Sequence, residues 1–129
     1  MNKIQRTATA AALVGAVAVP TAFVFASPAN ADMEKGGVCG NARYELNVDR
    51  ENGGFEVDAD LDNAAAGSQW RVVLRHDGKV FYNKIRTTDR EGDLDVERFR
   101  ANSPGADKFR LTVKRVGGAA ACTTVITTR

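Results

Sequence analysis

Over most of the chain from residue 42 to residue 128, apolar and polar side chains alternate with a period of two, as in β-strands that bury one face. In the first run, for example, Tyr44, Leu46 and Val48 are separated by single polar residues. Such runs predict seven strands, at residues 42–48, 55–61, 70–75, 80–87, 94–96, 109–114 and 122–128. The sequences between them contain turn signals, such as Asp77-Gly78, that join antiparallel strands. We therefore expect an all-β fold, with antiparallel strands packed as a two-sheet sandwich.

The first 31 residues show a different pattern, that of a secretory signal peptide. Lys3 and Arg6 precede an apolar stretch over residues 8–26, and Ala29-Asn30-Ala31 is a cleavage site of the A-x-A type. The alternative is a membrane anchor, because the stretch is nearly long enough to span a bilayer, although Pro20 interrupts it. We expect a signal peptide at 1–31 and one secreted, extracellular domain at 32–129, without a membrane segment.

The chain has two cysteines, Cys39 and Cys122, one near each end of the predicted domain. In an exported protein this arrangement predicts one disulfide, which would fasten the last strand to the first. Two free thiols are the alternative. A zinc site is less favoured, since the chain has a single histidine to complete the ligand set. We expect no cofactor.

The order of the predicted strands resembles that of a seven-stranded immunoglobulin-like domain. Trp70 falls where that family keeps a core tryptophan on its third strand, and Val57 and Leu111 lie near the positions of its usual cysteines. Asp107 and Phe109 match a corner where the family has an aspartate two residues before a tyrosine, but Phe109 lacks the hydroxyl. The resemblance implies that the first, second and fifth strands form one sheet and the other four form the second.

An alanine-rich signal and an excess of arginine over lysine make the chain similar to small secreted proteins of high-GC Gram-positive bacteria. The whole chain carries 18 basic and 16 acidic residues. Loss of Lys3 and Arg6 with the signal leaves 16 of each, so the net charge is zero. This balance does not indicate a nucleic-acid-binding protein.

In the implied arrangement, the outward side chains separate by the sign of their charge. Acidic residues gather on the first sheet, at Glu45, Asp49, Glu56, Asp58, Asp60, Asp93 and Asp95, with Arg43 among them. The two-residue turn Asp77-Gly78 places Tyr82 opposite Val73 and Lys84 opposite Arg71, which predicts an exposed apolar spot ringed by cations. The predicted basic binding face on the second sheet consists of Arg71, Val73, Arg75, Tyr82, Lys84, Arg86, Arg110 and Lys114.

Polar outer faces also keep proteins soluble, so charge alone does not establish a binding face. Like charges directly opposite one another are mildly destabilising, however, which favours a face that meets an anion. We expect the partner to be an acidic protein, a glycan or a cell-wall polymer. Weak self-association is a further hypothesis, because the acidic sheet complements the basic one.

The residues that carry enzymatic chemistry are scarce. His76 lies in a predicted turn, where we expect it to be solvated and far from a catalytic partner. The run Asp58-x-Asp60-x-Asp62 resembles the start of a calcium-binding loop, but it lacks the glycine at the sixth position and has Gln69 at the twelfth. We therefore expect neither an enzyme nor a metal site, and predict a secreted non-enzymatic binding module. The alternative is a secreted inhibitor of an exoenzyme, which would present the loop at 63–68 or at 103–107.

Overall fold

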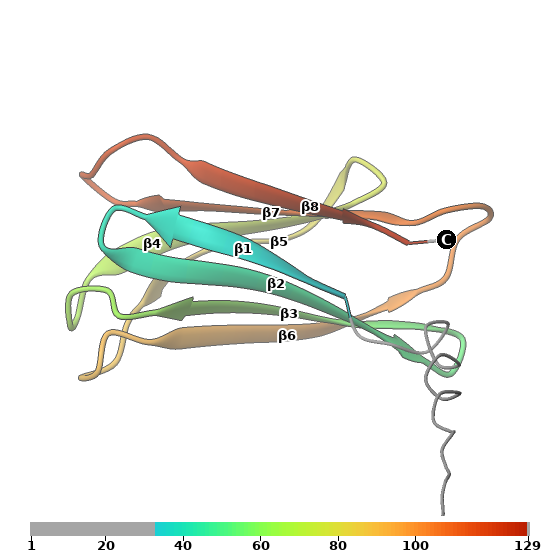
Figure 1. The fold of residues 1–129 in the computed structure, drawn as a ribbon, viewed down its shortest axis with the longest axis horizontal. Helices are drawn as coiled ribbons and strands as arrows, with labels where there is room; N and C mark the ends of the chain where they lie inside the picture. Colours follow the sequence, from blue (N-terminus) through green and yellow to red (C-terminus); the bar gives the residue numbers. More distant parts are fainter. Residues whose placement is uncertain (1–32, 129) are drawn as a thin grey trace, which may run out of the picture. The chain divides into compact units, whose positions relative to one another are not determined.

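The computed structural model describes residues 33–128, which form eight strands in two antiparallel four-stranded sheets (Figure 1). The strands are β1 (Met33–Cys39), β2 (Ala42–Glu51), β3 (Gly54–Asp62), β4 (Gln69–His76), β5 (Lys79–Thr87), β6 (Leu94–Ala101), β7 (Lys108–Arg115) and β8 (Cys122–Thr127). One sheet has the order β1-β2-β3-β6 and the other β5-β4-β7-β8. The predicted all-β sandwich is confirmed, whereas the predicted signal peptide at residues 1–31 lies outside the described residues.

The strand that the sequence pattern missed is β1, so the prediction of seven strands was one short. Its sequence, MEKGGVC, does not alternate, and only Cys39 in it is buried. It pairs with β2 along its whole length, after the tight turn at Gly40 and Asn41. A Cβ atom at Gly36 would clash with the carbonyl oxygen of Tyr44, so glycine allows the two strands to approach. Backbone pairing with β2, rather than side-chain burial, thus defines β1.

The core lies between the sheets and is built from the inward residues of every strand that alternates. Phe55 and Phe109 are fully buried and meet edge to face, with ring centroids 5.3 Å apart. Trp70, whose side chain is only 4% exposed, donates a hydrogen bond from Nε1 to Ser68 Oγ at 3.0 Å. Each fully buried large apolar side chain contributes about 1.5–3 kcal/mol.

The turn between β4 and β5 has the predicted two-residue form. Asp77 and Gly78 both adopt positive φ angles, 50° and 87°, which suit the right-handed twist of a hairpin. This turn places Val80 opposite Arg75, as the sequence predicted.

One residue later, the predicted register fails. The pairing shifts between Leu74 and Arg75, so that Tyr82 lies opposite Leu74 and Phe81 is the extra residue of a β-bulge. A shift of one residue turns every following side chain to the other face of its strand. The predicted exposure of Tyr82 was therefore wrong: its side chain is 5% exposed and belongs to the core.

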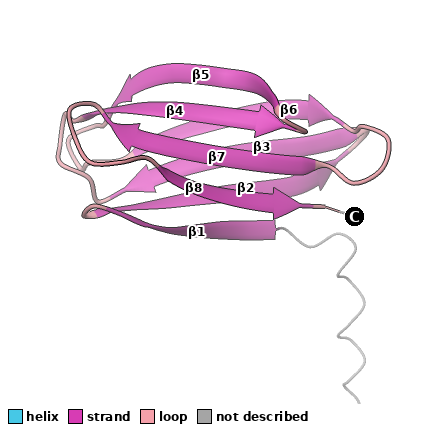
Figure 2. Ribbon diagram, turned by 90° about the horizontal axis from the view of Figure 1, so that it is seen from above, coloured by secondary structure: helices cyan, strands magenta, loops and turns pink. Residues whose placement is uncertain are grey.

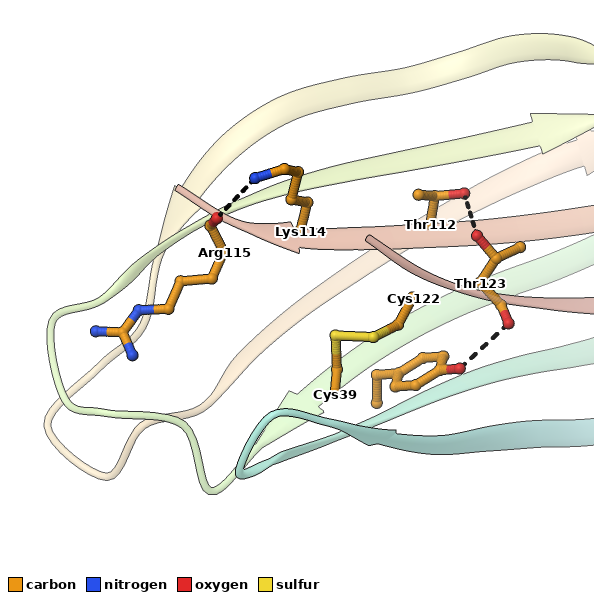
Figure 3. The surroundings of a disulfide bond; sticks show 7 residues. Cys39, Thr112, Lys114, Arg115, Cys122 and Thr123 are labelled. Atoms are coloured by element: carbon orange, nitrogen blue, oxygen red, sulfur yellow. Dashed lines mark hydrogen bonds between the residues drawn. A yellow bond between two sulfur atoms is a disulfide. The ribbon is translucent and has the colours of Figure 1, made fainter. Parts of the chain in front are cut away.

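The two open sides of the sandwich are closed by different interactions. On one side, β1 lies beside β8 (Figure 2), and the predicted disulfide Cys39–Cys122 joins the two strands (Figure 3). Tyr44 reinforces this side by donating a hydrogen bond from its hydroxyl to the Thr123 carbonyl at 3.2 Å.

On the other side, arginines from β6 cover aromatic rings from β5. The guanidinium of Arg98 lies 4.8 Å from the ring centroid of Tyr82, and that of Arg100 lies 4.6 Å from the ring centroid of Phe81. Such cation–π contacts are worth about 0.5–2 kcal/mol each. These inward-facing arginines on edge strand β6 also discourage pairing with another sheet.

The disulfide closes a loop with a sequence separation of 83 residues, so its removal should cost much of the stability. For Cys39→Ala combined with Cys122→Ala, we expect the free energy of unfolding to fall by roughly 4–5 kcal/mol, from the loop entropy gained by the unfolded chain. Urea unfolding followed by the fluorescence of Trp70 measures this change. A loss below about 1 kcal/mol would mean that the other contacts between β1 and β8 hold this side by themselves.

Candidate functional site: a basic face opposite an acidic face

The outer face of the sheet β5-β4-β7-β8 carries two pairs of cations, and we call this surface the basic face. Arg71 lies directly opposite Lys114, and Arg75 lies directly opposite Arg110, across the β4–β7 ladder. The two pairs are four residues apart along β4, or about 13 Å at the usual rise of a strand. Since like charges at such positions repel, this arrangement costs the free protein stability.

Neutral side chains fill the space between the two cation pairs. Val73 lies opposite Thr112 on β7 and Asn83 on β5. The hydroxyls of Thr112 and Thr123 are 3.1 Å apart and share a hydrogen bond (Figure 3). Arg71 donates from Nη1 to Asn83 Oδ1 at 2.7 Å, which orients its guanidinium toward this row. The centre of the basic face is therefore polar or weakly apolar, with cations at both ends.

No carboxylate neutralises these cations within the sheet. Among residues 33–128, none of the four cations has a carboxylate oxygen within 4.0 Å, and the two contacts this short between a basic side-chain nitrogen and a carboxylate oxygen both involve His76. The positive charge of the basic face thus remains available to a partner.

Three residues of the predicted binding face lie elsewhere, because the bulge at Phe81 reverses the rest of β5. Lys84 lies opposite Val72 and Arg86 opposite Trp70, both of which point into the sandwich. Arg86 donates from Nη1 to the hydroxyl of Tyr82 at 3.0 Å. The outward apolar residues of β5 are instead Val80 and Ile85, which are 47% and 45% exposed.

Lys84 and Arg86 nevertheless add to the positive surface. They lie on the inner side of edge strand β5, the edge where Arg98 and Arg100 of β6 cover the two aromatic rings. We call these four residues the basic edge. The positive surface therefore continues from the basic face around β5, whereas the sequence placed all of it on one flat sheet.

The outer face of the other sheet carries the opposite charge, as predicted. Four pairs of carboxyl groups lie directly opposite one another across its ladders: Asp49 with Glu56, Glu45 with Asp60, Asp58 with Glu97, and Asp60 with Asp95. We call this surface the acidic face. Asp93, expected on it, lies instead in the loop before β6, where its Oδ1 accepts a hydrogen bond from the Asn63 backbone amide at 3.3 Å.

Crowding raises the pKa of three carboxyl groups on the acidic face. A hydrogen bond with Glu97 and the charge of Glu97 raise the pKa of Glu56 to about 7. Burial, followed by the charges of Glu97 and Asp95, raises the pKa of Asp58 to about 6. Burial and a hydrogen bond with Asp95 raise the pKa of Asp60 to about 7. At neutral pH this face therefore retains part of its protons.

The acidic face also contains a group of oxygens close enough to hold a cation. One carboxylate oxygen from each of Glu56, Asp58 and Glu97 lies within 4.8 Å of the others, a donor set that suits Ca²⁺ or Mg²⁺. This group comes from β3 and β6. It is not the run Asp58-x-Asp60-x-Asp62 that the sequence suggested, because Asp60 lies beside Asp95.

His76 is not the solvated turn residue that the sequence predicted. Its side chain is 6% exposed and stacks on Phe109, with ring centroids 4.4 Å apart. Nδ1 lies 3.3 Å from Nε of Arg100, which can only donate, so Nδ1 accepts and Nε2 carries the proton. Nε2 then donates to Asp107 Oδ1 at 2.7 Å. His76 is thus a core residue with both ring nitrogens hydrogen-bonded.

Ser103 completes this group, but the order of residues differs from that of a nucleophilic triad. Its hydroxyl lies 2.5 Å from Asp107 Oδ1 and 2.8 Å from Asp77 Oδ2, and its backbone amide donates to Asp107 Oδ1 at 3.1 Å. In a triad the serine bonds to the histidine, whereas here the carboxylate lies between them. The group instead clamps the 102–107 loop to the turn at Asp77, where hydrogen bonds from the backbone of Lys108 and from Ser103 lower the pKa of Asp77.

Comparisons with protein-family models, with curated proteins and with solved structures found no match for this chain. Within residues 33–128 no helix is long and apolar enough to cross a membrane. Function must therefore be inferred from the surfaces of the domain itself.

The raised pKa values on the acidic face predict how stability depends on pH. In the folded protein the pKa values of Glu56, Asp58 and Asp60 are about 6 to 7, whereas carboxyl groups of an unfolded chain have pKa values near 4. These three groups therefore bind protons more tightly in the folded state than in the unfolded state. This stabilisation is fully present below about pH 4 and is lost as the pH rises through 6 to 7. We expect a higher free energy of unfolding at about pH 5.5 than at about pH 8, measured by urea unfolding.

Glu97→Gln should raise the stability at about pH 8 and weaken the pH dependence, because Glu97 raises the pKa of both Glu56 and Asp58. Glu34→Gln, on the same face but opposite the neutral Asn47 on β2, is the control. Identical pH profiles for Glu97→Gln and the wild type would show that repulsion on this face does not limit stability.

The clamp around Asp107 predicts a large effect of a single substitution. Asp107 is 1% exposed and accepts hydrogen bonds from His76 and Ser103, so Asp107→Ala leaves buried donors without an acceptor. We expect the free energy of unfolding to fall by about 2–4 kcal/mol. Asp62→Ala, on the exposed end of β3, should change it by less than about 0.5 kcal/mol. Equal effects of the two substitutions would contradict the clamp.

Proposed function

We propose that residues 32–129 form a secreted, non-enzymatic binding module whose basic face binds a linear acidic polymer, such as an acidic glycan or a cell-wall polymer. One observation carries this proposal: two pairs of cations lie side by side on the sheet and have no carboxylate partner among the described residues. The pairs are Arg71 with Lys114 and Arg75 with Arg110. An anion that bridges each pair would remove the repulsion between its members.

The spacing of the cations supports an extended ligand rather than a compact one. The cation pairs lie about 13 Å apart along β4, and the row at Val73 between them is neutral. A chain with repeating negative charges can meet both pairs at once. Its end beyond Arg71 would reach the basic edge at Lys84 and Arg86. Binding of this kind is electrostatic and weakens as salt is added.

Export of the module rests on the sequence of residues 1–31 together with the disulfide, since disulfides persist in oxidising compartments. We also infer that the sandwich is immunoglobulin-like. The sheet membership that this resemblance implied agrees with the observed strand orders, and Trp70 is buried in the core. In this view the bonds of His76 to Asp107 replace the tyrosine hydroxyl of the family's corner.

The 102–107 loop supports the alternative, a secreted inhibitor of an exoenzyme. Rigid loops suit inhibitors, and the bonds of Ser103 to Asp77 and Asp107 hold this loop without a nearby disulfide. Inhibition assays against secreted proteases and glycosidases separate the two proposals. If the wild type slows one of these enzymes and the Asp107→Ala variant does not, the result favours the inhibitor proposal.

The basic face predicts salt-dependent binding to heparin, used as a defined acidic glycan. For Arg71→Gln combined with Lys114→Gln, we expect about tenfold weaker binding at low salt by isothermal titration calorimetry. The slope of log K against log salt concentration should fall in magnitude by about 2, one for each lost contact.

The matched control is Lys35→Gln combined with Arg43→Gln, which makes the same change in net charge on the other sheet. It should bind heparin at least as well as the wild type. An equal loss of heparin affinity in the two double variants would mean that net charge alone attracts the glycan. Dimers that salt disperses, without heparin binding, would assign the basic face to the acidic face of a second copy.

A further inference from the structure

A pocket of about 460 Å³ opens at the end of the sandwich where the turns β1–β2, β3–β4 and β7–β8 meet. It lies beside the disulfide, and its lining includes none of the four cations of the basic face. Its size falls within the usual range for small-molecule sites, about 300–1,000 Å³.

Small side chains create this pocket. Ala64 and Ala65 line it from the β3–β4 loop, and Ala119 and Ala120 line it from the β7–β8 loop. Methyl groups cannot fill the space between these loops. Apolar walls without packing partners forgo dispersion contacts, which a ligand with an apolar body would restore.

Hydrogen bonds and the disulfide fix the loops that form the walls of the pocket. The backbone amide of Ala64 donates to the carbonyl of Gly92 at 3.0 Å, and the side-chain amide of Asn63 donates to the carbonyl of Asn41 at 3.4 Å. The disulfide holds Cys39 of the β1–β2 side to Cys122 at the start of β8. The pocket is therefore preformed, which reduces the entropy cost of binding.

The pocket has one charged lining residue, Arg115, at the end of β7. Its side chain points away from the disulfide, toward the loops at this end of the sandwich (Figure 3). Its aliphatic stem packs under Gly118, where a Cβ would approach the Arg115 Cβ to within 2.9 Å. Among residues 33–128, no side chain or carbonyl accepts a hydrogen bond from the Arg115 guanidinium, so its donors are available to a ligand.

The other distinctive lining residue is Trp70, which pairs with Arg115 across the β4–β7 ladder. The indole Nε1 already donates to Ser68 Oγ at 3.0 Å, so Trp70 offers the pocket only its apolar surface. The pocket thus combines an aromatic surface, alanine methyls and a single guanidinium.

We propose that this pocket binds a small amphiphilic anion, a molecule with an apolar body that ends in a carboxylate. The carboxylate accepts two parallel hydrogen bonds from the Arg115 guanidinium, whose planar fork matches its geometry. The apolar body lies against Trp70 and the alanine methyls. This site is separate from the proposed polymer-binding face and does not depend on it.

Trp70 is the only tryptophan of the chain, so its fluorescence reports on the pocket directly. Octanoate should change the emission of Trp70 saturably, with a stoichiometry of one by calorimetry. Octanamide, which has the same shape but no charge, should bind about tenfold more weakly. In Arg115→Gln the preference for octanoate over octanamide should disappear, while octanamide binding persists.

Two further variants keep the test decisive. Ala119→Leu should abolish binding of both probes by filling the pocket, with an unchanged circular dichroism spectrum. Arg71→Gln combined with Lys114→Gln should bind octanoate as the wild type does, which separates this site from the basic face. The proposal is overturned if octanoate does not bind saturably, or if Arg115→Gln and Ala119→Leu bind both probes as the wild type does.

Discussion

The alternation of side chains along each strand is the constraint on which the rest of this structure depends. Every second residue of β2, β3, β4 and β7 enters the core, and the residues between them must face solvent. The outward positions of β3 are acidic, and every charged residue at the outward positions of β4 and β7 is basic. Packing the two sheets core to core therefore places the opposite charges on opposite sides of the domain. The charge separation is thus a consequence of the fold and needs no ion pair across the sheets.

A single extra residue in β5 modifies this scheme. The bulge at Phe81 turns Tyr82, Lys84 and Arg86 from the outer face to the inner side of an edge strand. The aromatic rings then reach Arg98 and Arg100 of β6, and these contacts close one side of the sandwich while the disulfide closes the other. The same bulge therefore contributes to stability and carries the positive surface around the edge.

Regular patterns in the sequence predicted much of the fold, and local contacts explain what they missed. Alternation and spacing predicted seven of the strands, the turn at Asp77-Gly78 and the disulfide. They also predicted which side chains of the basic face point outward, namely Arg71, Val73, Arg75, Arg110 and Lys114. Strand β1 was missed because its pairing uses backbone groups, and the bulge because no residue type marks it. The bond between His76 and Asp107 joins residues 31 positions apart, and only the packed sheets bring them together. The pocket at Arg115 likewise needs three loops that are distant in sequence.

The central claim is that a linear acidic polymer binds on the basic face. Mapping backbone amide shifts by nuclear magnetic resonance during a heparin titration locates the contact directly. The account predicts that the shifted amides cluster on β4 and β7 around Arg71, Arg75, Arg110 and Lys114 and extend to the edge of β5, with β2 and β3 unchanged. Shifts confined to the loops around Arg115, or spread evenly over both sheets, would contradict it.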